Sequence, residues 1–415
     1  MEAAARKLLN ERMELLADAV ALEKEPKRVP VVPFICSVAQ KMFGSSYRDL
    51  YYDYDRAGKA EVEFYKAYPC DAYTFSGFSS GRANELAQST MLDWPGRPGT
   101  KVDDQSSHQA IEHDYVQPEE YKEMLDDFTG FMLRKYIPRA YPALKGLSGI
   151  GFVPSIILGT GFLSPLSNAA AAESWQILAE IGKCDAEAAA KSAEYQQKLF
   201  ELGMPPFYTG SGEVPFDIIS DYFRGTLGGL EDQIDYEDEM IEVCNKLADL
   251  QIASWTALRD SDQLVKTVHF PLHKGMDGFM SPGQFERLYW APFRRMLDAL
   301  VEMGIRPIIY TEGPYNTRLE QICDVPEGKC IVHFETADMR RAKETVGRVA
   351  CIAGNLPHYL LEYGTKEQVV DYCKMLVDVC APGGGYIFDT DACLENAKKE
   401  NLDAMFETMY TYGAK

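Results

Sequence analysis

The sequence predicts an α/β fold, a single (β/α)8 TIM barrel with additional N-terminal and inserted helices. The first observation is that five strand-like runs alternate with helical segments between Val265 and the C-terminus. Such alternation is typical of a parallel sheet with helices on its outside. The second observation is a pair of apolar runs near the N-terminus, so that one further strand completes a closed barrel of eight.

The five strands of the C-terminal half are short apolar runs of the kind that a parallel sheet buries on both faces. We expect them at Val265–Phe270, Arg306–Thr311, Lys329–Phe334, Val349–Asn355 and Gly385–Thr390, with the longer helices at Ser281–Met303 and Thr365–Val379. An open, doubly wound sheet is the alternative. No GxGxxG motif joins a strand to a helix, which argues against the dinucleotide-binding form of that fold.

The N-terminal half begins with a charged amphipathic helix, MEAAARKLLNERMELLADAV, which lacks the pattern of a signal peptide. Two apolar runs, Val29–Cys36 and Cys70–Gly77, are predicted barrel strands. The segment Met204–Val214 is predicted to be a loop because it is rich in proline and glycine. We expect one domain, residues 1–415, with helical additions around 115–262 that include Pro118–Met132, Ala169–Leu202 and Tyr236–Ala257.

The composition limits the classes of function. The formal net charge of −21 argues against a broad basic surface for nucleic acid or anionic membranes. The ten cysteines include no CxxC pair, which indicates reduced thiols and a cytoplasmic protein. No uninterrupted apolar run of about 18 residues is present, so we expect no membrane span.

Polar residues at the ends of the predicted strands are the candidates for chemistry, because a parallel barrel carries its catalytic groups there. They are His269, Tyr310, Glu312, His333, Glu335, Asn355, Asp389, Asp391 and Cys393, with His273 and Asp277 just beyond the first strand of this half. His269 and His273 have the spacing of a metal pair on a helix, but Pro271 between them makes a helix unfavourable.

Glu312 and His333 are the predicted metal ligands, because they close two strands that are neighbours in the sequence. Adjacent parallel strands lie about 4.8 Å apart, so two side chains at one level can share an ion. Asp391, or Cys393 as its rival, would complete a three-ligand zinc site with an open position. The alternative interpretation is a solvated loop glutamate and a hydrogen-bonded histidine at the rim.

Several phrases carry a resemblance to a known family. They are HFPLHKGMDGFMSPGQFERLYWAPFRRMLDAL, YTEG, CIAGNLP, LEYGTKEQVVDYCKMLV and ENLDAM, together with RVPVVPF and PFDIISDYFRG in the N-terminal half. In these phrases the chain resembles the uroporphyrinogen decarboxylase superfamily, and more narrowly its branch of cobalamin-dependent methyltransferases. The resemblance covers nearly the whole chain and is only weakly specific for a substrate.

The chain departs from two patterns of that superfamily. True decarboxylases carry arginines soon after the first strand, where this sequence reads CSVAQKMFG. Thiol methyltransferases carry His-x-Cys-Gly where this chain has Tyr310-Thr311-Glu312-Gly313, and a cysteine near the position of Asp391. A metal bound by carboxylate and imidazole keeps more Lewis acidity than one bound by thiolates, which suits an oxygen leaving group.

The resemblance therefore implies an aryl O-demethylase component of anaerobic bacteria, in which a Glu and a His stand about twenty residues apart. It implies methyl transfer from a methoxylated aromatic to the cob(I)amide of a separate corrinoid protein, with zinc held by Glu312, His333 and Asp391. Tyr310 is the expected proton donor, and Asn355 and His269 are expected to position the substrate. The Asp-x-His-x-x-Gly pattern of cobalamin-binding proteins is absent, so the cobalamin is expected on the partner.

Other functions stay open at this point. One is a methylcobamide-dependent methyltransferase with another donor or acceptor, such as a thiol, an amine or tetrahydrofolate. Another is a decarboxylase-like lyase, which would need an arginine cluster drawn from Arg294, Arg295 and Arg306. A catalytically silent partner-binding barrel is the third. A homodimer is compatible with each of them.

Overall fold

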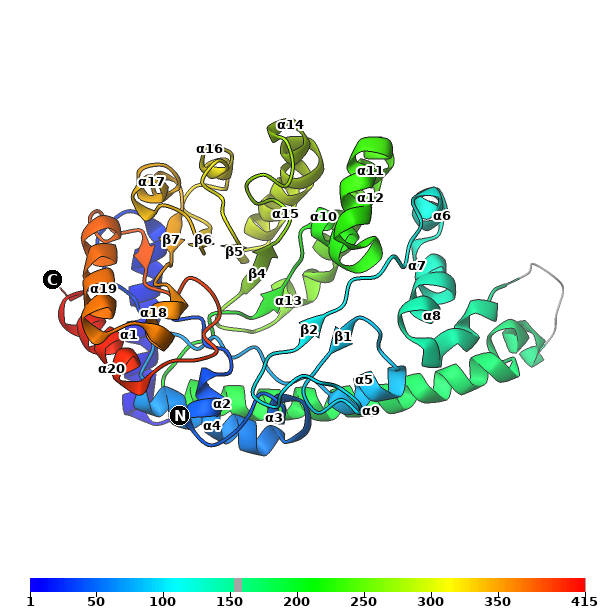
Figure 1. Cartoon of the computed structure of the whole chain (residues 1–415), viewed down its shortest axis with the longest axis horizontal. Coiled ribbons are helices and arrows are strands. Elements are labelled where there is room, and N and C mark those ends of the chain that lie inside the picture. Colours follow the sequence, from blue (N-terminus) through cyan, green and yellow to red (C-terminus); the bar gives the residue numbers. More distant parts are fainter. Residues whose placement is uncertain (153–158, 415) are drawn as a thin grey trace.

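The computed structural model describes residues 1–152 and 159–414 and shows an α/β fold around a parallel sheet (Figure 1). Six strands follow one another in the order β3 to β8, each parallel to its neighbours. Their bounds are Gly210–Ser211 (β3), Thr267–Leu272 (β4), Arg306–Thr311 (β5), Ile331–Phe334 (β6), Cys351–Ala353 (β7) and Tyr386–Ile387 (β8).

Two extended segments, 29–36 and 70–75, continue the sheet from β8 back to β3. Val31 bridges Phe388 in parallel, and the Asp71 amide donates to the Val31 carbonyl at 2.9 Å. Tyr73 in turn bridges Pro206, four residues before the start of β3. The ring therefore has the eight members that a TIM barrel requires, and the predicted fold class is confirmed.

The eighth strand lies where the sequence predicted a loop. The segment Met204–Val214 holds β3, which is only two residues long because proline and glycine shorten its ladder. Side chains supply the missing hydrogen bonds: the Thr209 hydroxyl donates to the Thr267 carbonyl at 3.0 Å, and the Thr267 amide donates to the Thr209 hydroxyl at 2.8 Å.

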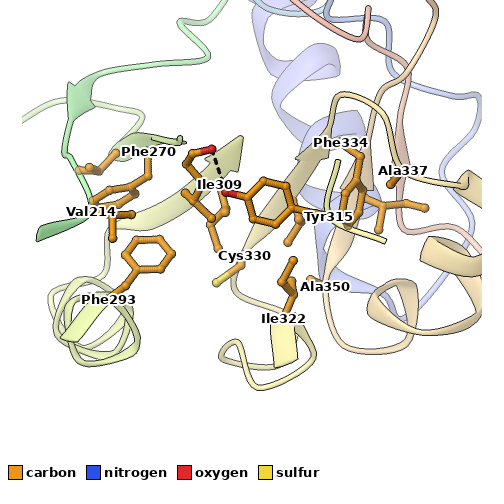
Figure 2. Packing of buried hydrophobic residues seen from close by; sticks show 14 of the residues in the cluster. Val214, Phe270, Phe293, Ile309, Tyr315, Ile322, Cys330, Phe334, Ala337 and Ala350 are labelled. Carbon is orange, nitrogen blue, oxygen red and sulfur yellow. Dashed lines mark hydrogen bonds between the residues drawn. The ribbon is translucent and has the colours of Figure 1, made fainter. Parts of the chain in front are cut away.

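Helices cover the outside of the sheet in the C-terminal half (Figure 1). They are α13 (Thr256–Asp260), α14 (Pro282–Gln284), α15 (Ala291–Glu302), α16 (Leu319–Ile322), α17 (Met339–Glu344), α18 (His358–Tyr363), α19 (Lys366–Cys380) and α20 (Lys399–Thr411). The core between strands and helices is apolar and tightly packed, with Phe270, Phe293, Ile309 and Phe334 all fully buried (Figure 2). Tyr315 joins this core and donates its hydroxyl hydrogen to the Leu272 carbonyl at 2.9 Å.

The remaining helices belong to the N-terminal part and to the inserted region. They are α1 (Ala3–Ala21), α2 (Val38–Met42), α3 (Asp49–Tyr52), α4 (Tyr54–Ala67), α5 (Gly81–Ala87), α6 (Tyr121–Asp126), α7 (Phe128–Phe131), α8 (Ile137–Ala140), α9 (Ala169–Glu201), α10 (Pro215–Asp217), α11 (Gly225–Asp235) and α12 (Glu237–Ser254). A short antiparallel pair, β1 (Leu92–Asp93) and β2 (Gln109–Ala110), lies beside them. The long helix α9 extends away from the barrel (Figure 1). None of the helices in the described ranges combines the length and the apolar composition needed to cross a bilayer.

Candidate active site

A layer of aromatic and imidazole rings fills the barrel near the carboxyl ends of its strands. Phe34 is the centre of this layer: the rings of Tyr208, His269, Tyr310 and His333 have their centroids 5.8 to 6.4 Å from its own. Successive rings also meet each other, with centroids 4.4 Å apart for Tyr208 and His269 and 4.7 Å apart for Tyr310 and His333. Phe34, Tyr208 and His269 are only half-buried although they lie inside the ring of strands, so they line accessible space.

Several buried polar atoms in this layer have no hydrogen-bond partner among the described residues: the Tyr208 hydroxyl, His269 Nε2, His333 Nδ1 and Asp389 Oδ2. Burial lowers the pKa of His269 to about 3 and that of His333 to about 4, so both imidazoles are neutral at pH 7. A buried polar group that is left unsatisfied costs about 1–3 kcal/mol. These unpartnered polar atoms are suited to bind a ligand that supplies the missing hydrogen bonds.

Asp389 fixes the geometry on one side of this layer. Its Oδ1 accepts from the amides of Phe34 and Thr390, both at 2.7 Å. His333 Nε2 donates to the Thr390 carbonyl at 2.7 Å, which leaves Nδ1 as the acceptor, 3.6 Å from Asp389 Oδ2. Burial raises the pKa of Asp389 well above its usual range.

A second group of charged side chains lies at the mouth of the barrel and is centred on His273, directly after β4. His273 Nδ1 lies 2.5 Å from Asp221 Oδ2 and 3.7 Å from Glu213 Oε1, while Nε2 lies 3.3 Å from Glu312 Oε2. Lys274 Nζ is 3.1 Å from the other Asp221 oxygen. We call Glu213, Asp221, His273 and Glu312 the acid–imidazole cluster.

Asp217 holds this cluster in place from below. It is fully buried and accepts from the amides of His273 and Lys274, both at 2.9 Å, and from the Tyr289 hydroxyl at 2.6 Å. Asp217 ends α10, and Asp221 lies one turn later on a π-helical turn, Ile218–Phe223. This turn brings both carboxylates to the loop that follows β4, where Asp221 contacts the His273 imidazole and Asp217 accepts from the backbone amides of His273 and Lys274.

The electrostatics of the cluster follow from burial and pairing. Burial raises the pKa of Glu213 to about 8 and that of Asp217 to about 6. Burial lowers the pKa of His273, but hydrogen bonds to Asp221 and Glu312 outweigh it and raise that pKa to about 11. His273 therefore carries a positive charge at neutral pH and sits among four carboxyl groups.

The structure does not bring the three predicted metal ligands together. Glu312 faces His273 rather than His333, and His333 is bonded to the Thr390 carbonyl. Asp391 accepts from the amides of His358 and Ala392 at 2.8 and 2.7 Å and lies 3.0 Å from His358 Nδ1. Within the described ranges, two other groups have their ligand atoms within 4.8 Å of one another: Glu213, Asp221 and His273, and separately Cys36, Cys393 and Glu395.

The other predicted residues line the same mouth. Tyr310 is buried in the ring layer, and burial together with the nearby Glu335 and Glu312 raises the pKa of its hydroxyl, which keeps it protonated. Asn355 donates from Nδ2 to the carbonyls of Glu335 and Ala337, at 3.1 and 3.0 Å, while its Oδ1 is buried and without a partner among the described residues. The Gly313 amide donates to the Glu335 carboxylate, which fixes the turn that carries Glu312.

Sequence reasoning missed Glu213 and Asp221, and it considered His273 only as the partner of His269 in a disfavoured metal pair. The only local signal was the i, i+4 spacing of Asp217 and Asp221, and nothing in the sequence connects that pair with the end of β4. The three arginines considered for carboxylate binding lie elsewhere. Arg294 pairs with Asp298 and Asp324 and Arg295 with Asp249, while Arg306 begins β5.

Comparisons with known proteins agree with this fold. Residues 208–412, just under half of the chain, match the family model described as uroporphyrinogen decarboxylase (URO-D). Among solved structures, a methyltransferase from Methanosarcina mazei has the same fold, with a TM-score of 0.60 and 12% identity over 97% of this chain and 98% of that chain. No curated protein matches the chain. The family match and the shared fold together support the uroporphyrinogen decarboxylase superfamily.

Proposed function

We propose that this chain, whose matches support the uroporphyrinogen decarboxylase superfamily, is the methyltransferase component of an aryl O-demethylase. It would take a methyl group from a methoxylated aromatic and pass it to the corrinoid of a separate partner protein. The observation that carries the proposal is the ring layer, in which an aromatic wall stands beside unpartnered polar atoms of Tyr208, His269 and His333.

The ring layer suits an aryl ether for two reasons. Aromatic side chains contact an aromatic ring in offset or edge-to-face geometry, which Phe34, Tyr208 and Tyr310 already show among themselves. The neutral His269 imidazole and the Tyr310 hydroxyl can donate a hydrogen bond to an ether oxygen, and neither carries a net charge that would attract a carboxylate. A small aromatic donor therefore fits this layer better than a polycarboxylate.

In the proposed reaction the bond between the methyl carbon and the ether oxygen breaks, and the phenolate oxygen takes the bonding electrons. The corrinoid of the partner supplies the nucleophile when it is docked at the mouth. The part of this chain is to hold the aromatic ring, exclude water and protonate the leaving oxygen, with Tyr310 as the proposed donor. His269 and Asn355 are proposed to position the substrate.

Zinc is part of the proposal as a Lewis acid at the ether oxygen. The set Glu312, His333 and Asp391 would have to give up its present contacts to hold an ion together. Glu213, Asp221 and His273 already have metal-ligand spacing, and Glu312 lies on the other nitrogen of the same imidazole. A zinc ion bound there would take the place of the proton on His273 Nδ1.

Carboxylate chemistry is less well supported at this mouth. The acid–imidazole cluster, Asp217, Glu335 and Asp391 bring acidic groups together there, and the cations among them are His273 and Lys274. A substrate with several carboxylates would be repelled by this charge. A decarboxylase-like lyase is therefore the weaker candidate.

The test is a methyl-transfer assay. The purified protein is mixed with cob(I)alamin or a corrinoid protein and with a panel of methoxybenzenes, and methylcobalamin formation is followed by absorbance. We expect turnover with at least one methoxybenzene and a rate lowered by about 10²-fold or more in Tyr310→Phe. The matched control is Tyr236→Phe. Tyr236 is the N-cap residue of α12 and is not a member of the ring layer.

The outcome that rejects the proposal is absence of turnover with every methoxybenzene, under conditions in which a known demethylase is active. Methyl transfer from an amine or a thiol ether alone would instead indicate a methyltransferase with another donor. An unchanged rate in Tyr310→Phe would remove Tyr310 as the proton donor and leave the donor class intact.

A further inference from the structure

A second cluster at the barrel mouth consists of two thiols and a carboxylate, and the proposed methyl transfer does not use it. It is formed by Cys36, Cys393 and Glu395, which we call the thiol cluster. One ligand atom of each side chain lies within 4.8 Å of those of the other two, and all three residues are half-buried. The residues come from opposite ends of the chain, so only barrel closure brings them together.

The backbone explains why the three side chains meet. Ile35 bridges Leu394 in parallel, the Leu394 amide donates to the Phe34 carbonyl at 2.7 Å, and the Cys36 amide donates to the Leu394 carbonyl at 3.1 Å. Ile35 and Leu394 are buried in the core. Side chains alternate along an extended chain, so the residues on either side of Ile35 and Leu394 point away from the core. This alternation places Cys36 beside both Cys393 and Glu395.

The surroundings shield the thiols on one side. Cys36 packs against a buried aromatic group of Tyr47, Tyr51 and Trp94. The two sulfur atoms and the Glu395 carboxylate lie so close together that ionisation of both thiols would bring three negative charges together. A cation that binds the three groups removes this repulsion.

We propose that Cys36, Cys393 and Glu395 bind a zinc ion, at a site distinct from the acid–imidazole cluster. Thiolate ligands favour zinc among the common divalent ions, and two thiolates with one carboxylate leave a fourth tetrahedral position for water. Binding releases the two thiol protons to solvent, with no change of oxidation state. The proposal stands whether or not the chain transfers methyl groups.

Cobalt(II) substitution tests the site. Metal-free protein under reducing conditions is titrated with Co(II), and the near-ultraviolet thiolate-to-cobalt charge-transfer band is recorded. We expect the band in the wild type, its loss in Cys36→Ser and Cys393→Ser, and weaker binding in Glu395→Gln. The weakening should be at least the roughly 10- to 100-fold that loss of an outer-shell partner costs. The matched controls are Cys323→Ser, which changes a half-buried thiol directly after α16, and Glu400→Gln on α20, and both should keep the wild-type band.

Three outcomes would overturn the site. The first is a wild-type protein that binds cobalt without a sulfur charge-transfer band, because ions on the acid–imidazole cluster have only oxygen and nitrogen ligands. The second is a band that survives in Cys393→Ser. The third is a disulfide between Cys36 and Cys393 in protein purified under reducing conditions. None of these depends on the methyl-transfer assay, so the two proposals fail separately.

Discussion

Three histidines at the carboxyl ends of β4 and β6 differ in charge because their surroundings differ. His269 and His333 are enclosed by rings, and burial lowers their pKa values to about 3 and 4. His273 follows His269 by four residues, but its two ring nitrogens contact the carboxylates of Asp221 and Glu312, and these contacts raise its pKa to about 11. The site thus combines neutral hydrogen-bonding imidazoles with one fixed positive charge.

Glu312 is the residue on which the proposed metal most depends. In a Cys393→Ser background, which removes the thiol cluster from the measurement, we expect Glu312→Ala to lower the zinc content of the purified protein. The physical reason is the loss of a carboxylate that either binds the ion or orients His273 against it. Elemental analysis measures the change.

The matched control for that experiment is Glu320→Ala, an exposed glutamate on α16 that pairs with Arg341. Its zinc content should equal that of the parent. Equal zinc in Glu312→Ala and in the parent would exclude Glu312 from the ligand set and from its support.

At the scale of elements, the strands of the C-terminal half follow the sequence pattern closely, and the added helices follow it less well. β5 has the predicted bounds, Arg306–Thr311, and α9 ends one residue before the predicted end of Ala169–Leu202. The predicted helix Pro118–Met132 is broken into a short 3-10 turn (Pro118–Glu120), α6 and α7. Asp127 caps α7 by accepting from the Gly130 amide, so a polar side chain interrupts an otherwise helical run.

Glu120 ties these short helices to α8. Its carboxylate accepts from Arg139 at 2.7 and 2.9 Å, from Lys135 at 3.0 Å and from the Gln117 amide at 3.0 Å. The hydrogen bonds from Arg139 are the main cause that lowers the pKa of Glu120 from 4.5 to about 2. Several short elements therefore share one anchoring carboxylate.

We expect Glu120→Gln to reduce the free energy of unfolding at pH 7 by about 1–2 kcal/mol, after allowance for the partial exposure of the two cations. Because the folded pKa is depressed, the stabilisation is complete above pH 4.5 and is lost as the pH falls through about 2. The difference between wild type and variant should shrink over that window in urea titrations. Glu123→Gln, which removes an exposed ion pair with Lys135, is the control and should change stability by less than about 1 kcal/mol at each pH. A difference that persists at pH 2 would contradict the assignment.

At the scale of the whole molecule, the barrel closes at the segments 29–36 and 70–75, where the ladder is carried by isolated bridges rather than by long strands. Asp71 reinforces this seam. Its carboxylate binds both Arg28 nitrogens at 2.6 and 2.5 Å and accepts from the Val31 amide at 2.8 Å, and Arg12 of α1 lies 3.9 Å away. The side chain is fully buried, so the pair is poorly screened by solvent.

We expect Asp71→Ala to reduce the free energy of unfolding by about 3–5 kcal/mol, because it leaves Arg12 and part of Arg28 buried without a counter-charge. Equilibrium denaturation measures the loss. Asp55→Ala removes an exposed ion pair with Lys191 and should cost less than about 1 kcal/mol. Equal losses in the two variants would show that the seam does not depend on Asp71.

The sequence alone determined the parallel barrel and the end of the barrel that carries the candidate catalytic residues, because both follow from local patterns. Apolar runs of strand length fix β4 to β8, and a parallel barrel puts polar strand ends at one face. The superfamily resemblance is supported by the match over residues 208–412, and the O-demethylase branch stays a prediction. Tyr310, His269 and His333 do lie in one ring layer, as their positions at strand ends indicated.

Only the tertiary structure decided which side chains face each other. Glu312 and His333 end neighbouring strands, yet the Glu312 side chain contacts His273. Asp221, from the inserted helices, holds the His273 imidazole, and the hydrogen bond from the Gly313 amide to Glu335 fixes the turn that carries Glu312. The thiol cluster depends on closure between residues 36 and 393, which no local pattern reports. Strand periodicity acts over a few residues, whereas these contacts join segments that lie far apart in the sequence, such as residues 36 and 393.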